Sequence, residues 1–203
     1  MSHPDPHGPP DLTPIRFGEV WENPVTGERA TILELPFTNP EGRATAELTA
    51  PFGTRLPGEH RHPTVVERLT VLEGELTLTL DGQTSTLRRA DTAVVEPNVW
   101  HDWWNATDYT TRVQVEVTPG ERFGHMIETI FGLARLGYTD AKGMPHLLQL
   151  ALTSREFSDV IQFRRPPAAV QRVLFGALAP IARRRGYRAT YPQLSRTVLA
   201  PRA

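Results

Sequence analysis

Apolar and polar residues alternate along the chain from Ile15 to Val117, and this alternation predicts a series of short β-strands. Segments 15–21 and 29–35 alternate in this way and are joined at 23–27 by a stretch of Asn, Pro and Gly that is typical of a turn. Further strands are predicted over 43–50, 76–80, 83–87, 93–96, 102–105 and 112–117. Asp81-Gly82 separates two of these runs, which is a strong hairpin signal. Many short strands with no helical pattern between them predict a mainly β protein built as an antiparallel sandwich or barrel.

After Pro119 the apolar residues follow the period of a helix. Three helices are predicted: from Phe123 to a stop at Gly137, over 145–157, and from Pro166-Pro167 to a stop at Gly186. The third has an apolar stripe made by Val170, Val173, Leu174, Ala177, Leu178 and Ile181, and Pro180 is expected to kink or split it. Because the first two helices are apolar enough to need a partner surface, we expect 120–203 to be a helical extension packed on the barrel, 15–119, or on a dimer partner.

The amino-acid composition excludes several kinds of site and segment. The chain has no cysteine, which excludes disulfides, thiolate metal ligands and cysteine nucleophiles. Residues 1–14 contain five prolines and two histidines and are expected to form a disordered arm, with no feature of a secretory signal. No segment approaches the roughly 20 consecutive apolar residues of a membrane span. We therefore expect a cytoplasmic protein.

The net charge of −1 hides an asymmetry. Nine of the 22 basic residues are arginines in 164–203, a stretch without any acidic residue, so 1–163 has 13 basic and 23 acidic residues. The basic stretch is expected to pack on its own acidic barrel or on that of a partner. Contact of the 166–185 helix, which ends in three arginines, with a membrane surface is the alternative. No nucleic-acid-binding motif is present, so no nucleic-acid partner is expected.

Four residue positions have the composition of a metal site. His60 and His62 are two apart, so on a strand both side chains point to one face of the sheet. Glu67 is expected on the same or a neighbouring strand after a short connection through Pro63, and His101 lies far enough along for a hairpin and a return strand to bring it alongside. Three imidazoles and a carboxylate suit a divalent transition metal ion such as Fe, Mn, Ni, Co, Cu or Zn, and leave positions open for exchangeable ligands.

The residues around these four resemble the two sequence motifs of the cupin superfamily over about 43–118. Positions matching the first motif are Gly53, His60, His62, Glu67 and Gly74, and those matching the second are Ala90, Glu96, Asn98, His101 and Asn105. Ala90 and Asn98 stand where the family has glycine, and Glu96 stands where it has proline. Asn is the residue other than Gly that best tolerates the left-handed region, so Asn98 is compatible with the motif. No departure falls on a ligand position.

The resemblance implies a fold, a site and an assembly. The fold is an antiparallel double-stranded β-helix, or jelly-roll barrel, with the metal inside it and exchangeable positions facing the mouth. Residues in phase with the ligands are expected to line the pocket, namely Leu69, Val71, Leu78 and Trp103, although Trp103 has an equally good interpretation as core filling. Such walls favour an apolar or aromatic small molecule. Family barrels commonly pair through their sheet edges, so a homodimer is implied.

Other polar residues are expected to lie outside the site. Arg55, Arg61 and Gln114 could contact a ligand in the pocket, but the preferred interpretation is that they lie on the surface. His125 and His146 fall on predicted helices and are interpreted as packing or surface residues, and His3 and His7 belong to the arm.

Two functions remain open. The first is a metal-dependent enzyme of the quercetin-dioxygenase-like type, in which the ion brings substrate and dioxygen together and Glu67 doubles as a catalytic base. Metal-assisted isomerisation or ring cleavage is a variant of it. The second is a binding module that holds a small ligand without turnover. Both need the same ligands, so the sequence does not separate them.

Overall fold

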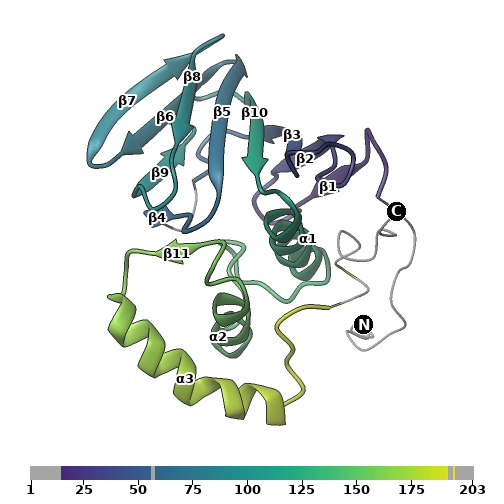
Figure 1. Ribbon diagram of the computed structural model, residues 1–203, viewed down its shortest axis with the longest axis vertical. Helices are drawn as coiled ribbons and strands as arrows, with labels where there is room; N and C mark the ends of the chain where they lie inside the picture. The colour runs from purple at the N-terminus through teal and green to yellow at the C-terminus, as the bar shows by residue number, and fades with distance from the viewer. Residues whose placement is uncertain (1–14, 56–57, 192–193, 195–203) are drawn as a thin grey trace.

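In a computed structural model of the chain, 15–55, 58–191 and residue 194 are described; the arm at 1–14, with His3 and His7, lies outside these residues. Two antiparallel sheets form the body of the molecule (Figure 1). The six-stranded sheet has the order β1 (Val20–Glu22), β2 (Arg29–Glu34), β3 (Ala44–Ala50), β10 (Thr111–Thr118), β5 (Val66–Glu73) and β8 (Thr92–Val95). The five-stranded sheet has the order β11 (Gln162–Phe163), β4 (His60–Arg61), β9 (His101–Trp104), β6 (Glu75–Leu80) and β7 (Gln83–Arg88). The predicted mainly β jelly-roll class is confirmed.

Alternation fixes which face of each strand is buried. Leu76 and Leu78 on β6 are buried, whereas Thr77 and Thr79, which alternate with them, are only partly buried. The same period places one apolar face of both sheets in a shared core, made by Ala50, Leu69, Val71, Leu76, Leu78, Trp103 and Val113. Burial of these side chains contributes the main stabilisation of the barrel.

Two turn predictions are confirmed by backbone angles. Asp81 and Gly82 both have positive φ, at 47° and 81°, and they connect β6 to β7 in a two-residue hairpin. Ala90 and Asn98 also have positive φ, at 74° and 68°, as their match to glycine positions of the cupin motif implies. The Asn98 backbone N–H donates to the carbonyl of His62 at 2.8 Å, which ties this turn to the end of β4.

The predicted first strand is wrong over most of its length. Strand β1 begins only at Val20, so just two residues of the predicted 15–21 belong to it, because Gly18 with φ of 77° bends the chain before it. The Glu19 backbone N–H donates to the carbonyl of Arg16 and closes this bend. Ile15 is nevertheless buried, so the apolar side chain packs without strand pairing.

Three helices follow the barrel strands: α1 (Glu121–Arg135), α2 (Leu147–Glu156) and α3 (Ala168–Arg184). Pro180 lies inside α3, which continues through it and is not split. Gly120 precedes α1 and lies so close to Ala44 that a Cβ at this position would collide with it. Within the described residues, no helix is both long enough and apolar enough to cross a membrane.

The inner face of the six-stranded sheet is covered by two different elements. Over β5 and β10 it faces the five-stranded sheet, and over β1 and β2 it faces α1 (Figure 1). Trp21 and Ile32 of the sheet form one buried cluster with Phe131 of α1. Helix α1 therefore completes the core where the second sheet ends.

Candidate metal centre

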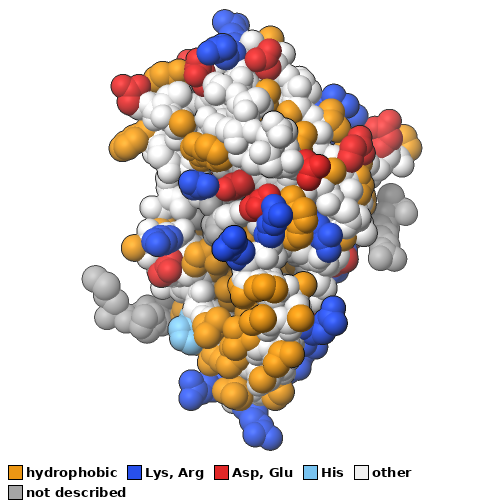
Figure 2. All heavy atoms as spheres, turned by 90° about the vertical axis from the view of Figure 1, so that its left-hand side faces the viewer, with side chains coloured by type: hydrophobic (Ala, Val, Ile, Leu, Met, Phe, Trp, Pro, Cys, Tyr) orange, Lys and Arg blue, Asp and Glu red, His pale blue; other side chains and the backbone are white. Residues whose placement is uncertain are grey.

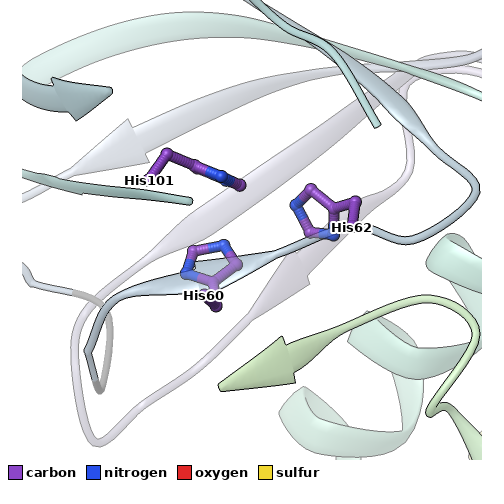
Figure 3. A group of neighbouring side chains, drawn as sticks. All are labelled: His60, His62 and His101. Atoms are coloured by element: carbon purple, nitrogen blue, oxygen red, sulfur yellow. The ribbon is translucent and has the colours of Figure 1, made fainter. Parts of the chain in front are cut away.

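The three histidines converge from two neighbouring strands. His60 on β4 is paired in register with His101 on β9, and His62 lies one residue past the end of β4. Their rings face a common space in Figure 3, and one ligand nitrogen from each lies within 4.8 Å of those of the other two. All three side chains are at most 2% exposed. The short strand and the i, i+2 spacing thus bring the histidines together as the sequence predicts.

Each ring is held by a hydrogen bond on its far side. The Nδ1 of His60 lies 3.1 Å from the carbonyl oxygen of Gly58, that of His62 lies 2.8 Å from Val160, and that of His101 lies 3.1 Å from Val99. A carbonyl oxygen only accepts, so Nδ1 carries the hydrogen in each ring. In the neutral ring Nε2 is then an unprotonated lone-pair donor, which is the state that binds a metal.

The expectation that Glu67 lies on the strand of His60 or on a neighbouring one is wrong. Glu67 lies on β5 and reaches the same space from the opposite sheet. Its Oε2 is 3.2 Å from Nε2 of His101 and 3.7 Å from Nε2 of His62. Neither contact has the geometry of a hydrogen bond, and these three atoms are buried without a partner. Buried polar atoms without a partner are costly, so the cluster is incomplete as a purely protein structure.

The charges of the cluster depend on burial and on mutual contact. Burial lowers the pKa of His60 to about 3, and the neighbouring His101 and His62 act in the same direction. Burial also lowers the pKa of His62, but the Glu67 carboxylate and the Val160 carbonyl outweigh it, so the net pKa is raised. Burial raises the pKa of Glu67, and contact with His101 and His62 more than reverses this, so Glu67 is a carboxylate.

These residues fit a divalent transition metal ion. Imidazole nitrogens and a carboxylate oxygen are ligands that such ions accept, and the atoms left without partners are the ligand atoms themselves. A spacing within 4.8 Å can be bridged by metal–nitrogen bonds of roughly 2.1 Å after small side-chain rotations. The donor set does not distinguish between Fe, Mn, Ni, Co, Cu and Zn.

A cavity of about 250 Å³ adjoins the cluster, and His60, His62, Glu67 and Trp103 form part of its wall. The rest of the wall is mainly apolar and comes from β2, β3, β10 and α1; it includes Ile32, Leu35, Ala46, Leu48, Val115, Phe123, Met126, Ile127 and Phe131. Leu69, Val71 and Leu78, which were expected in the pocket, do not line this cavity. They point into the barrel interior as predicted, but there they pack against one another in the core.

The segment after α2 contributes to the site in a way that no sequence pattern predicted. Strand β11 pairs with β4 at the edge of the five-stranded sheet and places Phe163 opposite His60, with ring centroids 5.9 Å apart. Val160 just before it supplies the carbonyl that holds His62. Phe123 of α1 packs edge-on to the His62 ring at 5.5 Å. The sequence signal here is a short run with three apolar residues, Val160, Ile161 and Phe163, which is too short to predict a strand.

The remaining polar residues have mostly structural contacts. Arg55 lines the cavity and pairs with Asp102 at 3.1 Å, while its guanidinium lies over the Trp104 ring. Arg61 donates to Gln162, and Gln114 donates to Glu116.

His125 and His146 lie at helices, as the sequence indicates. His125 packs edge-on to Phe157, and His146 caps α2 by accepting from the Leu148 backbone N–H.

Comparison with known proteins gives the family. Residues 47–123 match the family model of the cupin domain. The chain therefore contains a cupin domain. The chain is 34% identical over 84 residues to gentisate 1,2 dioxygenase 1 of Aquipseudomonas alcaligenes, an alignment of 39% of the chain. The chain spans about a quarter (24%) of the length of that relative.

Solved structures with a similar fold include KdgF from Halomonas sp., at 18% identity and a TM-score of 0.44 over 52% of this chain and 90% of that one. The cupin domain of Schizosaccharomyces pombe Cnp3 matches at 13% identity and a TM-score of 0.42, over 52% of this chain and 74% of that one.

Proposed function

We propose that this protein is a metal-dependent, dioxygenase-like enzyme that acts on a small apolar or aromatic molecule. The observation that carries the proposal is that His60 and His62 of the histidine cluster line a largely apolar cavity. Enzyme sites combine a predominantly apolar pocket with a few convergent polar groups, which is the arrangement here. The similarity to a gentisate dioxygenase over part of the chain supports the same reaction class.

His60, His62 and His101 would hold the ion through Nε2, because their Nδ1 atoms are engaged with backbone carbonyls. A bound ion of this kind brings a substrate oxygen and dioxygen together and stabilises developing negative charge. Glu67 is a carboxylate within reach of the same space, so it can complete the ligand set or take a proton from the substrate.

The volume and lining of the cavity restrict the substrate. An engineered apolar cavity of roughly 150 Å³ holds benzene, so a cavity of about 250 Å³ admits a substituted ring. Trp103 and Phe123 provide aromatic walls beside the histidines, where a planar ring would pack. Among the described residues of the cavity wall, basic side chains do not gather beside the histidines. This favours neutral or singly charged molecules over phosphorylated ones.

The test begins with elemental analysis of protein purified without chelator, with His62→Ala and His101→Ala as comparisons. We expect a transition metal in the wild type, or uptake on incubation, and none in either variant. Oxygen consumption is then measured with the restored metal across gentisate, catechols, diketones and flavonoids. Absence of metal uptake would overturn the metal site.

Metal-dependent binding of these compounds without oxygen consumption would instead identify a binding module and overturn the enzymatic part of the proposal.

A further inference from the structure

Helix α3 presents an apolar stripe to the exterior. Val173 is 73% exposed, Val170 49%, Ile181 46% and Leu174 38%, and at 3.6 residues per turn these positions fall on one face of the helix. Figure 2 shows the hydrophobic surface that they form in the lower part of the molecule, where α3 lies. Single exposed apolar residues are ordinary, but a continuous stripe of them on one helix marks an interaction surface.

This stripe is not the face by which α3 is held to the protein. Phe175, Ala179 and Ala182 are buried, and the two alanines share a cluster with Leu148 and Leu152 of α2. The helix therefore has two apolar faces, one packed against α2 and a second one exposed to the exterior. Exposing this second apolar face to water is unfavourable, which indicates that a partner covers it.

The charge around the stripe has a single sign. Arg172, Arg183 and Arg184 on the helix and Arg185 directly after it are all exposed. Within the described residues none of these four arginines forms an ion pair with a carboxylate. No acidic residue occurs anywhere from Arg164 to the end of the sequence. The partner of this surface must therefore be both apolar and anionic.

Two occupants from within the protein fit poorly. Packing the stripe on the same stripe of a second copy would bring the unpaired arginines of both helices together without any compensating acid. On the acidic barrel of a second copy, Glu34, Glu47 and Glu75 are already paired with Arg43, Arg112 and Arg88, so these carboxylates are not free to receive the arginines of α3.

We propose that α3 binds the surface of a membrane containing anionic lipid, with its apolar stripe in the headgroup boundary and its arginines on lipid phosphates. Seventeen residues give a helix of about 25 Å, long enough to lie in the interface. An apolar stripe flanked by arginines is the pattern of such interfacial helices, and each nearby arginine adds to the attraction of an anionic surface. Because α3 continues from β11, which pairs with β4, this attachment would bring the metal cluster close to the membrane.

The proposal is tested by co-sedimentation of the full chain with vesicles of phosphatidylcholine alone and of equal amounts of phosphatidylcholine and phosphatidylglycerol. We expect binding to the anionic vesicles that weakens by about tenfold or more with added salt, and little binding to the neutral ones. Val173→Asp and the triple variant Arg183→Ala, Arg184→Ala, Arg185→Ala should each reduce it by about tenfold or more.

Matched controls come from the barrel. Phe52 is 71% exposed, so Phe52→Asp makes the same kind of change away from α3 and should leave binding unaltered. Arg16→Ala, Arg88→Ala and Arg89→Ala together remove the same charge as the triple variant. Failure to bind anionic vesicles, or equal loss with the controls, would overturn the proposal. A wild-type dimer that Val173→Asp dissociates, measured by analytical ultracentrifugation without lipid, would overturn it in favour of contact between copies.

Discussion

Nδ1 of His62 lies 2.8 Å from the carbonyl oxygen of Val160, a residue 98 positions further along the chain. This hydrogen bond fixes the ring orientation of a histidine in the barrel from a segment outside it. Strand β11 follows two residues later and pairs with the strand that carries His60. The candidate site is therefore built jointly by the cupin strands and by the segment between α2 and α3.

We expect Phe163→Ala to weaken metal binding by roughly 10-fold to 100-fold, the range typical of residues that support ligands. Phe163 packs on the His60 ring and belongs to the strand that holds this edge in place. Affinity is measured by competition with a chelator, and Phe52→Ala on the exposed surface is the control. An affinity equal to that of the wild type would show that β11 has no part in the site.

Glu67→Gln should retain the ion on the three histidines with an affinity lowered by about tenfold or more. The amide keeps the size of the carboxylate but removes the charge that faces His62 and His101. Metal content and chelator competition measure this, with Glu73→Gln on the same strand but at the surface as the control. Full retention of affinity together with loss of turnover would instead assign Glu67 as a base alone.

Ala46→Phe should abolish binding of aromatic ligands and leave the metal in place. Ala46 is part of the cavity wall on β3, across from α1, so a larger side chain there occupies the space. Quenching of tryptophan fluorescence reports ligand binding, and elemental analysis reports the ion. Ala106→Phe at an exposed position is the control. Ligand binding that survives in Ala46→Phe would place the substrate elsewhere.

The free energy of unfolding should decrease as the pH is lowered through the range in which His125 titrates in the unfolded chain but not in the folded protein. Burial lowers the pKa of His125 to about 4, and the nearby Arg122 acts in the same direction. Between about 6.5 and 4 the unfolded chain takes up a proton that the folded protein does not, so the free energy of unfolding decreases as pH falls.

His125→Phe keeps the packing on Phe157 and removes the titration. With allowance for solvent near the ring, the wild type should lose about 1–2 kcal/mol relative to this variant across the window. Urea unfolding at several pH values measures the difference, and a constant difference would contradict the assignment.

Ala90→Gly should raise the free energy of unfolding by about 0.5–1 kcal/mol. Ala90 has φ of 74°, where a Cβ costs roughly 1–2 kcal/mol, and only part of this is offset by the greater flexibility of glycine when unfolded. Gly74→Ala should do the reverse and cost more than about 2 kcal/mol, because its φ is 82° and a Cβ would meet Thr111 Oγ1 at 2.9 Å. Urea unfolding of both variants measures whether the free energy of unfolding rises in Ala90→Gly and falls in Gly74→Ala.

The sequence was most informative where one local rule decided the structure. The i, i+2 spacing of His60 and His62 sets a common face on any strand, and Asp81-Gly82 sets a hairpin, so both predictions are confirmed. Asn98 was expected in a left-handed conformation and has it. In each case the cause lies within a few residues of the effect.

Features that depend on long-range packing were not predictable in the same way. Nothing near Glu67 indicates that it approaches from the opposite sheet, since this follows from the crossover between β4 and β5. Leu69, Val71 and Leu78 have the correct inward phase, but phase does not tell a cavity wall from a filled core. The wall is made instead by α1 and the strands it covers, which share no motif with the ligands.

The division of the ligands between two sheets has a mechanical consequence. His60, His62 and His101 belong to or adjoin one sheet and Glu67 belongs to the other, so an ion held by all four would act as a cross-link through the barrel. Ion binding then adds to the free energy of unfolding in proportion to the logarithm of the free ion concentration. The supply of metal in the cell would then determine whether the site is occupied. It would also determine how resistant the folded chain is to proteolysis.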